Sequence, residues 1–337
     1  MLCLYSAEPY ELKETMNTIR IGFLGAGDVA DLHAEAVNSL PGTELKGLWS
    51  WKQEEGKVKA AQYGCQTYET ADELFNDPEI DAVFVLTNME THCELTVKAA
   101  KAGKHVLVEK PAASNIKELK KMQAAVREAG VQCMPVHNYI YEAGIKRTHS
   151  MIQRGKIGDI TQFYMLYNIH HADEIRVRYP GVIRQILTHH AYTMLYLAGP
   201  PKSISCFKHT VDATIAPQEN VAMATMKMTS GALSHLCASF ANDEHAGDPW
   251  TCMIKVIGTK GSTRYSYRDW VINERAGPHS QTFFCYPESI KNTAKYFIDN
   301  VLRLGEQPLS NLDDAITCQR IIEACEHSAE EGIHVNL

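Results

Sequence analysis

The sequence predicts an α/β protein in two parts: a doubly wound parallel sheet, followed by an α+β domain with a large, open and mostly antiparallel sheet. The chain has 337 residues, which suits two ordinary domains. From residue 18 to about 138, apolar strands alternate with helices, as in a parallel sheet built from βαβ units. Beyond about residue 140, long strand-like runs follow one another with Gly, Asn and Asp in their turns, which indicates antiparallel strands.

The first domain is expected over residues 18–138. Its predicted strands are 19–25, 44–50, 81–87, 105–110 and 131–138. Its predicted helices are 29–40, 54–63, 71–77, 91–103 and 115–130. Gly130 stands where glycine is favoured, just past a helix C-terminus. Residues 1–17 lack the basic and apolar regions of a secretory signal. We expect these residues to form a short leader before the fold.

The second domain is expected over residues 139–337. Its strand-like runs are 159–171, 221–241 and 250–267. Its predicted helices are 185–198, about 289–304 and 313–331. The sequence shows no internal repeat and no low-complexity segment.

Composition and charge favour a small-molecule ligand. The 33 Lys and Arg residues against 40 Asp and Glu residues give a net charge of −7, and without a long basic run, nucleic acid and anionic membranes are poor partners. The longest apolar stretches, such as 82–86, are far shorter than the roughly 20 residues of a membrane-spanning helix. Ten scattered cysteines without a C-x-x-C pair suit reduced thiols in the cytoplasm.

The segment GFLGAGDVA at 22–30 lies between the first strand and the first helix. Gly25 suits a tight turn, Gly27 allows backbone amides to approach a pyrophosphate, and Ala30 permits close helix packing. The unpaired N–H groups of the helix N-terminus would bind the anion. We therefore expect a dinucleotide site, with contacts from Gly25, Gly27, Asp28 and Val29.

An acidic residue that would hold an NAD ribose is missing at the end of the second strand, where Ser50, Trp51 and Lys52 stand instead. A hydroxyl and a cation suit the 2′-phosphate of NADP, whereas the neighbouring Glu54 and Glu55 argue for NAD. The cofactor is therefore predicted to be NAD or NADP, with these three residues beside it.

Glu109-Lys110-Pro111 directly follows the strand 105–110, at the carboxyl edge of the sheet where such folds bind ligands. A partly desolvated lysine at this edge can hydrogen-bond a substrate hydroxyl and transfer a proton. The alternative is a surface lysine at a turn, and the tripeptide alone leaves both open.

Together with GFLGAGDVA, the segment 86–113, which contains AGKHVLVEKP, and the closing stretch 310–335 resemble the Gfo/Idh/MocA family of oxidoreductases. The resemblance implies an N-terminal Rossmann domain, a second domain used for substrate binding and often for oligomerisation, and NAD(P)-linked chemistry on sugars or cyclitols. It implies that Glu109 holds the nicotinamide ribose, that Lys110 faces the reacting carbon, and that the bond before Pro111 is often cis. The residues that it places along the cofactor groove are Thr87, Asn88 and His92.

The family's second catalytic element, D-x-x-x-H with a later acid, matches the stretch 181–199 only in part. Gln185 stands at the first acid position, His189 is retained, and Tyr192 stands at the later acid position. An amide cannot stabilise an imidazolium as a carboxylate does, so His189 is expected to be a weaker general base, with Lys110 or Tyr192 sharing the proton.

Further polar residues lie near this element. His137 and Tyr139 are candidate substrate contacts, beside Gln185 and His189. The histidines, including His170 and His171, suit either a metal site or ordinary polar contacts, and no metal site is predicted. Three arginines flank the region as solvated residues or as contacts to an anionic group: Arg176, Arg178 and Arg184.

The function expected from these observations is NAD(P)-dependent hydride transfer at a secondary alcohol or ketone of a sugar or cyclitol. Two alternatives remain: a glycosidase or lyase that oxidises its substrate only transiently, and a non-catalytic dinucleotide or sugar sensor. An exposed sheet face in the second domain favours a homo-oligomer, a dimer or a tetramer.

Overall fold

A computed structural model describes residues 18–169, 173–241, 250–266 and 285–337. The predicted leader, His170 and His171 lie outside these residues.

The first sheet has six parallel strands in the order β3-β2-β1-β4-β5-β6. The strands are β1 (Ile19–Leu24), β2 (Thr43–Trp49), β3 (Gln66–Tyr68), β4 (Ala82–Val85), β5 (His105–Val108) and β6 (Cys133–Pro135). This order reverses between β1 and β4, and ligands bind outside the carboxyl ends of the strands at such a point. The doubly wound sheet is confirmed, although β6 is shorter than the predicted 131–138 because a 3-10 turn begins at Asn138.

Helices cover both faces of this sheet. They are α1 (Asp28–Asn38), α2 (Gln53–Tyr63), α3 (Ala71–Asn76), α4 (Met89–Lys101) and α5 (Ile116–Ala129). The sequence explains the start of α3 and the end of α5. Thr70 and Glu73 form a capping box at the start of α3, and Gly130 ends α5 in the left-handed conformation, as predicted.

The second sheet has seven strands in the order β12-β11-β7-β10-β9-β8-β13. The strands are β7 (Ile160–Ile169), β8 (Pro201–His209), β9 (Val221–Met228), β10 (Leu233–Ser239), β11 (Trp250–Gly258), β12 (Ser262–Ser266) and β13 (Val335–Asn336). All neighbours pair antiparallel except β7 and β10, which are parallel. The runs 221–241 and 250–267 each form two strands, because Gly231 and Gly261 lie in the turns that divide them.

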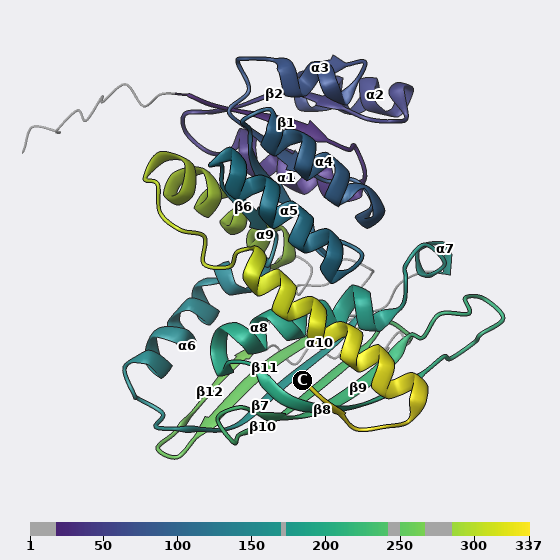
Figure 1. Ribbon diagram of the computed structural model, residues 1–337, viewed down its shortest axis with the longest axis vertical. Coiled ribbons are helices and arrows are strands. Elements are labelled where there is room, and N and C mark those ends of the chain that lie inside the picture. Colours follow the sequence, from purple (N-terminus) through teal and green to yellow (C-terminus); the bar gives the residue numbers. More distant parts are fainter. Residues whose placement is uncertain (1–17, 170–172, 242–249, 267–284) are drawn as a thin grey trace, which may run out of the picture.

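The helices of the second part lie on one face of that sheet or beside the helices of the first sheet (Figure 1). They are α6 (Ala143–Gln153), α7 (Asp173–Arg176), α8 (Thr188–Ala198), α9 (Cys285–Lys295) and α10 (Leu312–Glu331). Alternate side chains of β9 are buried beneath them. The other face exposes apolar side chains, including Phe207 at 74%, Leu233 at 55% and Met223 at 45%.

One apolar core continues from the first sheet into the second. The Phe84 ring of β4 contacts Phe297, which follows α9, and the same cluster includes Phe163 and Ile254 of the second sheet. In addition, α9 packs on α1, and α10 contacts both α5 and β8. A division of the chain at residue 138 stays a prediction. Within the described residues, no helix is long and apolar enough to cross a membrane.

Candidate active site

The turn between β1 and α1 has the shape that a dinucleotide needs. Gly25 has a φ of +112°, and a Cβ there would lie 2.8 Å from the carbonyl carbon and oxygen of Leu86. Gly27 precedes α1 and is exposed, and a Cβ there would meet no atom of the described residues within 4 Å. The open backbone at this helix N-terminus fits a pyrophosphate, which a side chain at Gly27 would obstruct. Asp28 and Val29 begin the helix.

Ser50, Trp51 and Lys52 follow β2 at the same edge. The Ser50 hydroxyl is buried and accepts from the Lys52 backbone N–H at 3.3 Å. Trp51 is 70% exposed. The Lys52 ammonium lies 5.5 Å from the Trp51 ring centre and 2.7 Å from a Glu55 oxygen, an exposed pair that a ligand could displace at little cost.

Thr87, Asn88 and His92 lie after β4. Asn88 is exposed at the start of α4 and makes no capping bond with its side chain. His92 is buried, with Nε2 2.9 Å from the Thr87 carbonyl oxygen and Nδ1 3.0 Å from that of Pro111. Burial lowers the pKa of His92 and outweighs its bonds to the Thr87 and Pro111 carbonyls, which act to raise it. His92 therefore joins the end of β4 to the loop after β5.

Glu109 directly follows β5 and is a buried carboxylate with protein partners on both oxygens. Oε1 lies 3.0 Å from His33 Nε2 of α1, and Oε2 accepts from the Lys110 backbone N–H at 3.0 Å. Burial acts to raise the pKa of Glu109, but the His33 hydrogen bond and the charges of His33 and Lys110 outweigh it and hold that pKa below the usual value. His33 was missed by the sequence analysis, although it stands on the buried face of the helix that follows the glycine turn.

Lys110 follows β5 of the first sheet and His189 lies on α8, and the two are close enough for the Lys110 charge to act on the His189 ring. The predicted cis bond is confirmed between Lys110 and Pro111. Lys110 Nζ donates to the backbone oxygen of Gln185 at 3.4 Å, and burial lowers the pKa of Lys110, opposed by Glu109. The pKa of His189 lies well below its usual value, first through burial and then through the nearby Lys110 charge.

The predicted helix 185–198 begins earlier and differently from the prediction. Its first turn, Ile183–Leu187, is π-helical and continues directly into α8. Such turns are rare and often occur at functional sites. Here the turn presents the carbonyl of Gln185 to Lys110, and His189 follows in the first turn of α8.

Tyr192, His137 and Tyr139 surround His189. His189 Nδ1 lies 2.7 Å from the Tyr192 hydroxyl. The His137 ring stacks on Tyr192 with centres 4.3 Å apart and bonds Ser310 Oγ at 2.6 Å, and burial lowers its pKa to about 3. Tyr139 is fully buried and meets His189 edge-on at 5.1 Å. The predicted residues are thus brought together, and their roles toward substrate stay predictions.

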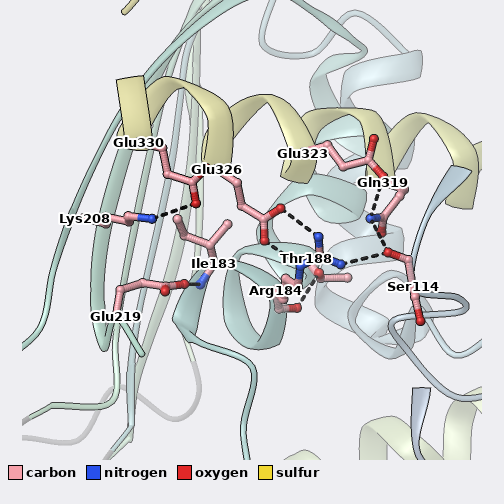
Figure 2. A network of polar contacts seen from close by, with 10 residues as sticks. All are labelled: Ser114, Ile183, Arg184, Thr188, Lys208, Glu219, Gln319, Glu323, Glu326 and Glu330. Carbon is pink, nitrogen blue, oxygen red and sulfur yellow. Dashed lines mark hydrogen bonds and ion pairs between the residues drawn. The ribbon is translucent and has the colours of Figure 1, made fainter. Parts of the chain in front are cut away.

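Arg184 joins α10 to the loop after β5, contrary to its interpretation as a solvated residue or an anion contact. Figure 2 shows its guanidinium fork on Glu326 of α10, with Nε 2.5 Å and Nη2 2.9 Å from the two carboxylate oxygens. Nη1 donates to the Ser114 backbone oxygen at 2.9 Å, and Gln319 reaches the same oxygen at 3.4 Å. The loop from Lys110 to Ser114 is therefore fixed to the turn that precedes His189.

Replacing Arg184 by methionine is expected to lower the free energy of unfolding by about 3 kcal/mol, because Glu326 is left as a half-buried charge without its partner. Chemical denaturation measures this difference. Lys208→Met is the matched control, since it removes a more exposed ion pair with Glu330 on the same helix, for which we expect less than about 1 kcal/mol. Equal effects of the two substitutions would contradict the anchoring role.

Within the described residues, no group of three His, Cys, Asp or Glu side chains could hold a metal ion. Eight cysteines are free thiols: Cys65, Cys93, Cys133, Cys206, Cys237, Cys252, Cys318 and Cys325.

Comparison with known proteins agrees with this geometry. A model of the "Oxidoreductase family, NAD-binding Rossmann fold" matches residues 19–137, and the "GFO/IDH/MocA C-terminal domain" matches residues 145–264. The chain is 30% identical over 253 residues to a 1,5-anhydro-D-fructose reductase of Ensifer adhaerens, covering 72% of this chain and 74% of that protein. It is 25% identical to a myo-inositol 2-dehydrogenase of Thermotoga maritima, covering 95% and 98% of the two chains.

Among solved structures, the scyllo-inositol dehydrogenase of Lactobacillus casei with bound NAD(H) and scyllo-inositol superposes with a TM-score of 0.84. That likeness covers 95% of this chain and 99% of the other at 18% identity, and it bears on the fold. The glycine turn, the sheet order and the two family matches lead to one conclusion: this chain belongs to the GFO/IDH/MocA family of NAD-binding oxidoreductases.

Proposed function

We propose that this oxidoreductase acts on a secondary alcohol of a sugar, sugar derivative or cyclitol, or on the corresponding ketone. The observation that carries the proposal is the bond from Lys110 Nζ to the backbone oxygen of Gln185, one helical turn before His189, beside the carboxyl edge that holds the dinucleotide turn. The names of the relatives, a 1,5-anhydro-D-fructose reductase and a myo-inositol 2-dehydrogenase, support this substrate class.

Different residues would bind different parts of the cofactor. The turn from Gly25 to Val29 would hold the pyrophosphate, while Ser50, Trp51 and Lys52 would meet the adenosine ribose. Glu109, Thr87 and Asn88 would line the nicotinamide end. The nicotinamide, when bound, supplies the acceptor or donor of the hydride.

Lys110 and His189 would handle the proton of the reacting hydroxyl. The Lys110 ammonium can donate a hydrogen bond to that oxygen and stabilise the charge that develops on it. His189, neutral because its pKa is low, can accept the proton at its second nitrogen, since Nδ1 is occupied by Tyr192. Gln185 contributes its backbone oxygen to orient Lys110, and its side chain remains a candidate substrate contact.

Transient oxidation followed by elimination stays the alternative, because the acidic partners of the family's histidine are replaced by Gln185 and Tyr192. Incubation with NAD or NADP and a panel of sugars, cyclitols and glycosides distinguishes the two. We expect reduced cofactor and a product that is lighter by two hydrogens. A cleaved product without net reduction of the cofactor would establish the alternative, and binding without any turnover would favour the sensor.

The pH dependence of the reaction should reflect the two lowered pKa values. In the oxidation direction, kcat/KM is expected to stay level from pH 8 down to pH 6.5 and to fall only well below pH 6.5, because the pKa of His189 lies well below its usual value. In the reduction direction, kcat/KM should fall at a pKa below 10.5, as Lys110 loses its proton. The role of His189 would be contradicted if kcat/KM for oxidation already fell on acidification above pH 6.5 and if the same fall remained in His189→Gln.

We further propose that the exposed face of the second sheet joins copies of this chain into a dimer or a tetramer. Phe207, Met223 and Leu233 on that face are apolar and exposed, as interface residues often are. Light scattering should give a mass above that of the 37.7 kDa chain, and Phe207→Asp should lower it. Leu304→Asp, which alters an exposed residue elsewhere, should leave the mass unchanged. A monomeric wild type would refute the proposal.

The cytoplasmic location is also a proposal. The buried free thiols, such as Cys133 and Cys318, suit a reducing compartment.

A further inference from the structure

A chain of four buried hydrogen bonds leads from His189 to a backbone carbonyl at the start of α9. His189 Nδ1 lies 2.7 Å from the Tyr192 hydroxyl, which lies 2.9 Å from Asn138 Oδ1. Asn138 Nδ2 lies 2.6 Å from Ser289 Oγ, and that hydroxyl lies 2.7 Å from the Tyr286 backbone oxygen. The four side chains that make up this relay are at most 3% exposed: His189, Tyr192, Asn138 and Ser289.

The carbonyl at the end sets the direction of every bond in the relay. A carbonyl oxygen only accepts, so the Ser289 hydroxyl donates to Tyr286 and must itself accept from Asn138 Nδ2. The Asn138 amide is thereby oriented with Oδ1 toward Tyr192, and Oδ1 accepts the Tyr192 proton. The Tyr192 oxygen can then only accept further hydrogen bonds. It accepts one from the Tyr139 backbone N–H at 3.3 Å, and its bond with His189 Nδ1 must also be one that it accepts.

We infer that this relay fixes the proton of His189 on Nδ1 and leaves the lone pair on Nε2, so that Asn138 and Ser289 are positioning residues for the base. The inference rests on the proposed function, in which His189 Nε2 takes the substrate proton. In the reverse arrangement, the Ser289 and Tyr286 oxygens would face each other at 2.7 Å without a proton between them. A buried pair of acceptors of this kind is unfavourable.

The relay replaces one of the two functions of a carboxylate partner. A carboxylate beside His189 would fix the tautomer and also stabilise the imidazolium. The neutral relay fixes the tautomer alone, and it needs no rearrangement when Nε2 gains a proton, because Nδ1 donates in both states. Its neutrality agrees with the low pKa of His189, which burial and the charges of Lys110, His190 and His137 lower.

The tautomer can be observed without any turnover. Long-range proton–nitrogen correlation spectra of the full chain labelled with ¹⁵N-histidine distinguish the two ring nitrogens, and His189→Gln identifies the signals. At about pH 8, we expect wild-type His189 to carry its proton on Nδ1. A wild-type proton on Nε2 would overturn the inference.

Substitutions along the relay test its direction. In Ser289→Ala, Asn138 is free to turn its amide and donate to Tyr192, so we expect a mixture of tautomers and a kcat about tenfold lower at an unchanged KM. In Ser289→Ala/Asn138→Asp, the ionised carboxylate can only accept, so the Nδ1 proton and most of kcat should return. An unchanged tautomer in Ser289→Ala, or a double variant without recovery of the tautomer, would overturn the relay.

Thr293→Val is the matched control. Thr293 is likewise buried on α9, and its hydroxyl donates to the Ser289 backbone oxygen outside the relay. It should keep the wild-type tautomer and kcat, and a change equal to that of Ser289→Ala would overturn the assignment to the relay. If wild-type protein converts no substrate of the panel, the proposed function fails, and the spectra still decide whether the relay exists.

Discussion

Lys110→Met is expected to lower kcat by about 10²–10⁴-fold, the usual contribution of a positioned acid or base, and to leave cofactor binding intact. Methionine retains the length and the apolar stem of lysine but has no proton to donate. Among the described residues, the substitution removes the hydrogen bond of Nζ to the Gln185 oxygen and the Lys110 charge that acts on Glu109 and His189. The bond from the Lys110 backbone N–H to Glu109 is unaffected by the side chain, so the nicotinamide end should keep its shape.

Turnover and NADH binding, the latter followed by fluorescence titration, measure the two effects separately. Lys46→Met is a suitable control, because Lys46 pairs with Glu79 on the first sheet, away from the proposed site, and should leave kcat unchanged. Full activity in Lys110→Met would exclude this lysine from proton transfer. Loss of NADH binding together with turnover would instead assign it to the cofactor.

The fold could largely be predicted because its signals are local. Strand β4 is an unbroken apolar run, and the glycine turn after β1 is visible in the sequence. Elements with weaker local signals were missed. Strand β8 carries Lys202, Lys208 and His209 on exposed positions, so it lacks the apolar runs that identified its neighbours, and the π-helical turn Ile183–Leu187 has the same periodicity over five residues as an ordinary helix start.

The site could be predicted only as far as its motifs extend. Glu109, Lys110 and His189 stand in recognisable patterns. Their partners do not, because His33 lies 76 residues before Glu109, and Asn138 lies 151 residues before Ser289. No spacing rule relates such pairs. Arg184 was interpreted as solvated for the same reason, since Glu326, 142 residues later, supplies the charge that holds it.

His33→Leu is expected to lower the free energy of unfolding by about 3 kcal/mol at neutral pH, because removal of one partner leaves the buried Glu109 charge poorly compensated. His33 lies between the rings of Phe23 and Phe84, and its buried Nδ1 has no hydrogen-bond partner in the described part of the chain. The pocket around it is therefore apolar, and leucine should fill it without a new unpaired group. The decrease in the free energy of unfolding therefore measures the uncompensated charge of Glu109.

The pH dependence and a double variant distinguish this cause from poor packing. Because the pKa of Glu109 is lowered in the folded protein, its favourable contribution is present above the pKa of the unfolded chain and disappears as the pH falls through the folded value. The difference between His33→Leu and wild type should therefore shrink on acidification, as the carboxyl becomes neutral in both proteins. His33→Leu/Glu109→Met removes both polar groups and should recover most of the stability at pH 7, since two apolar residues can replace a buried pair. A loss that is independent of pH and that persists in the double variant would show that His33 matters only as a packed ring.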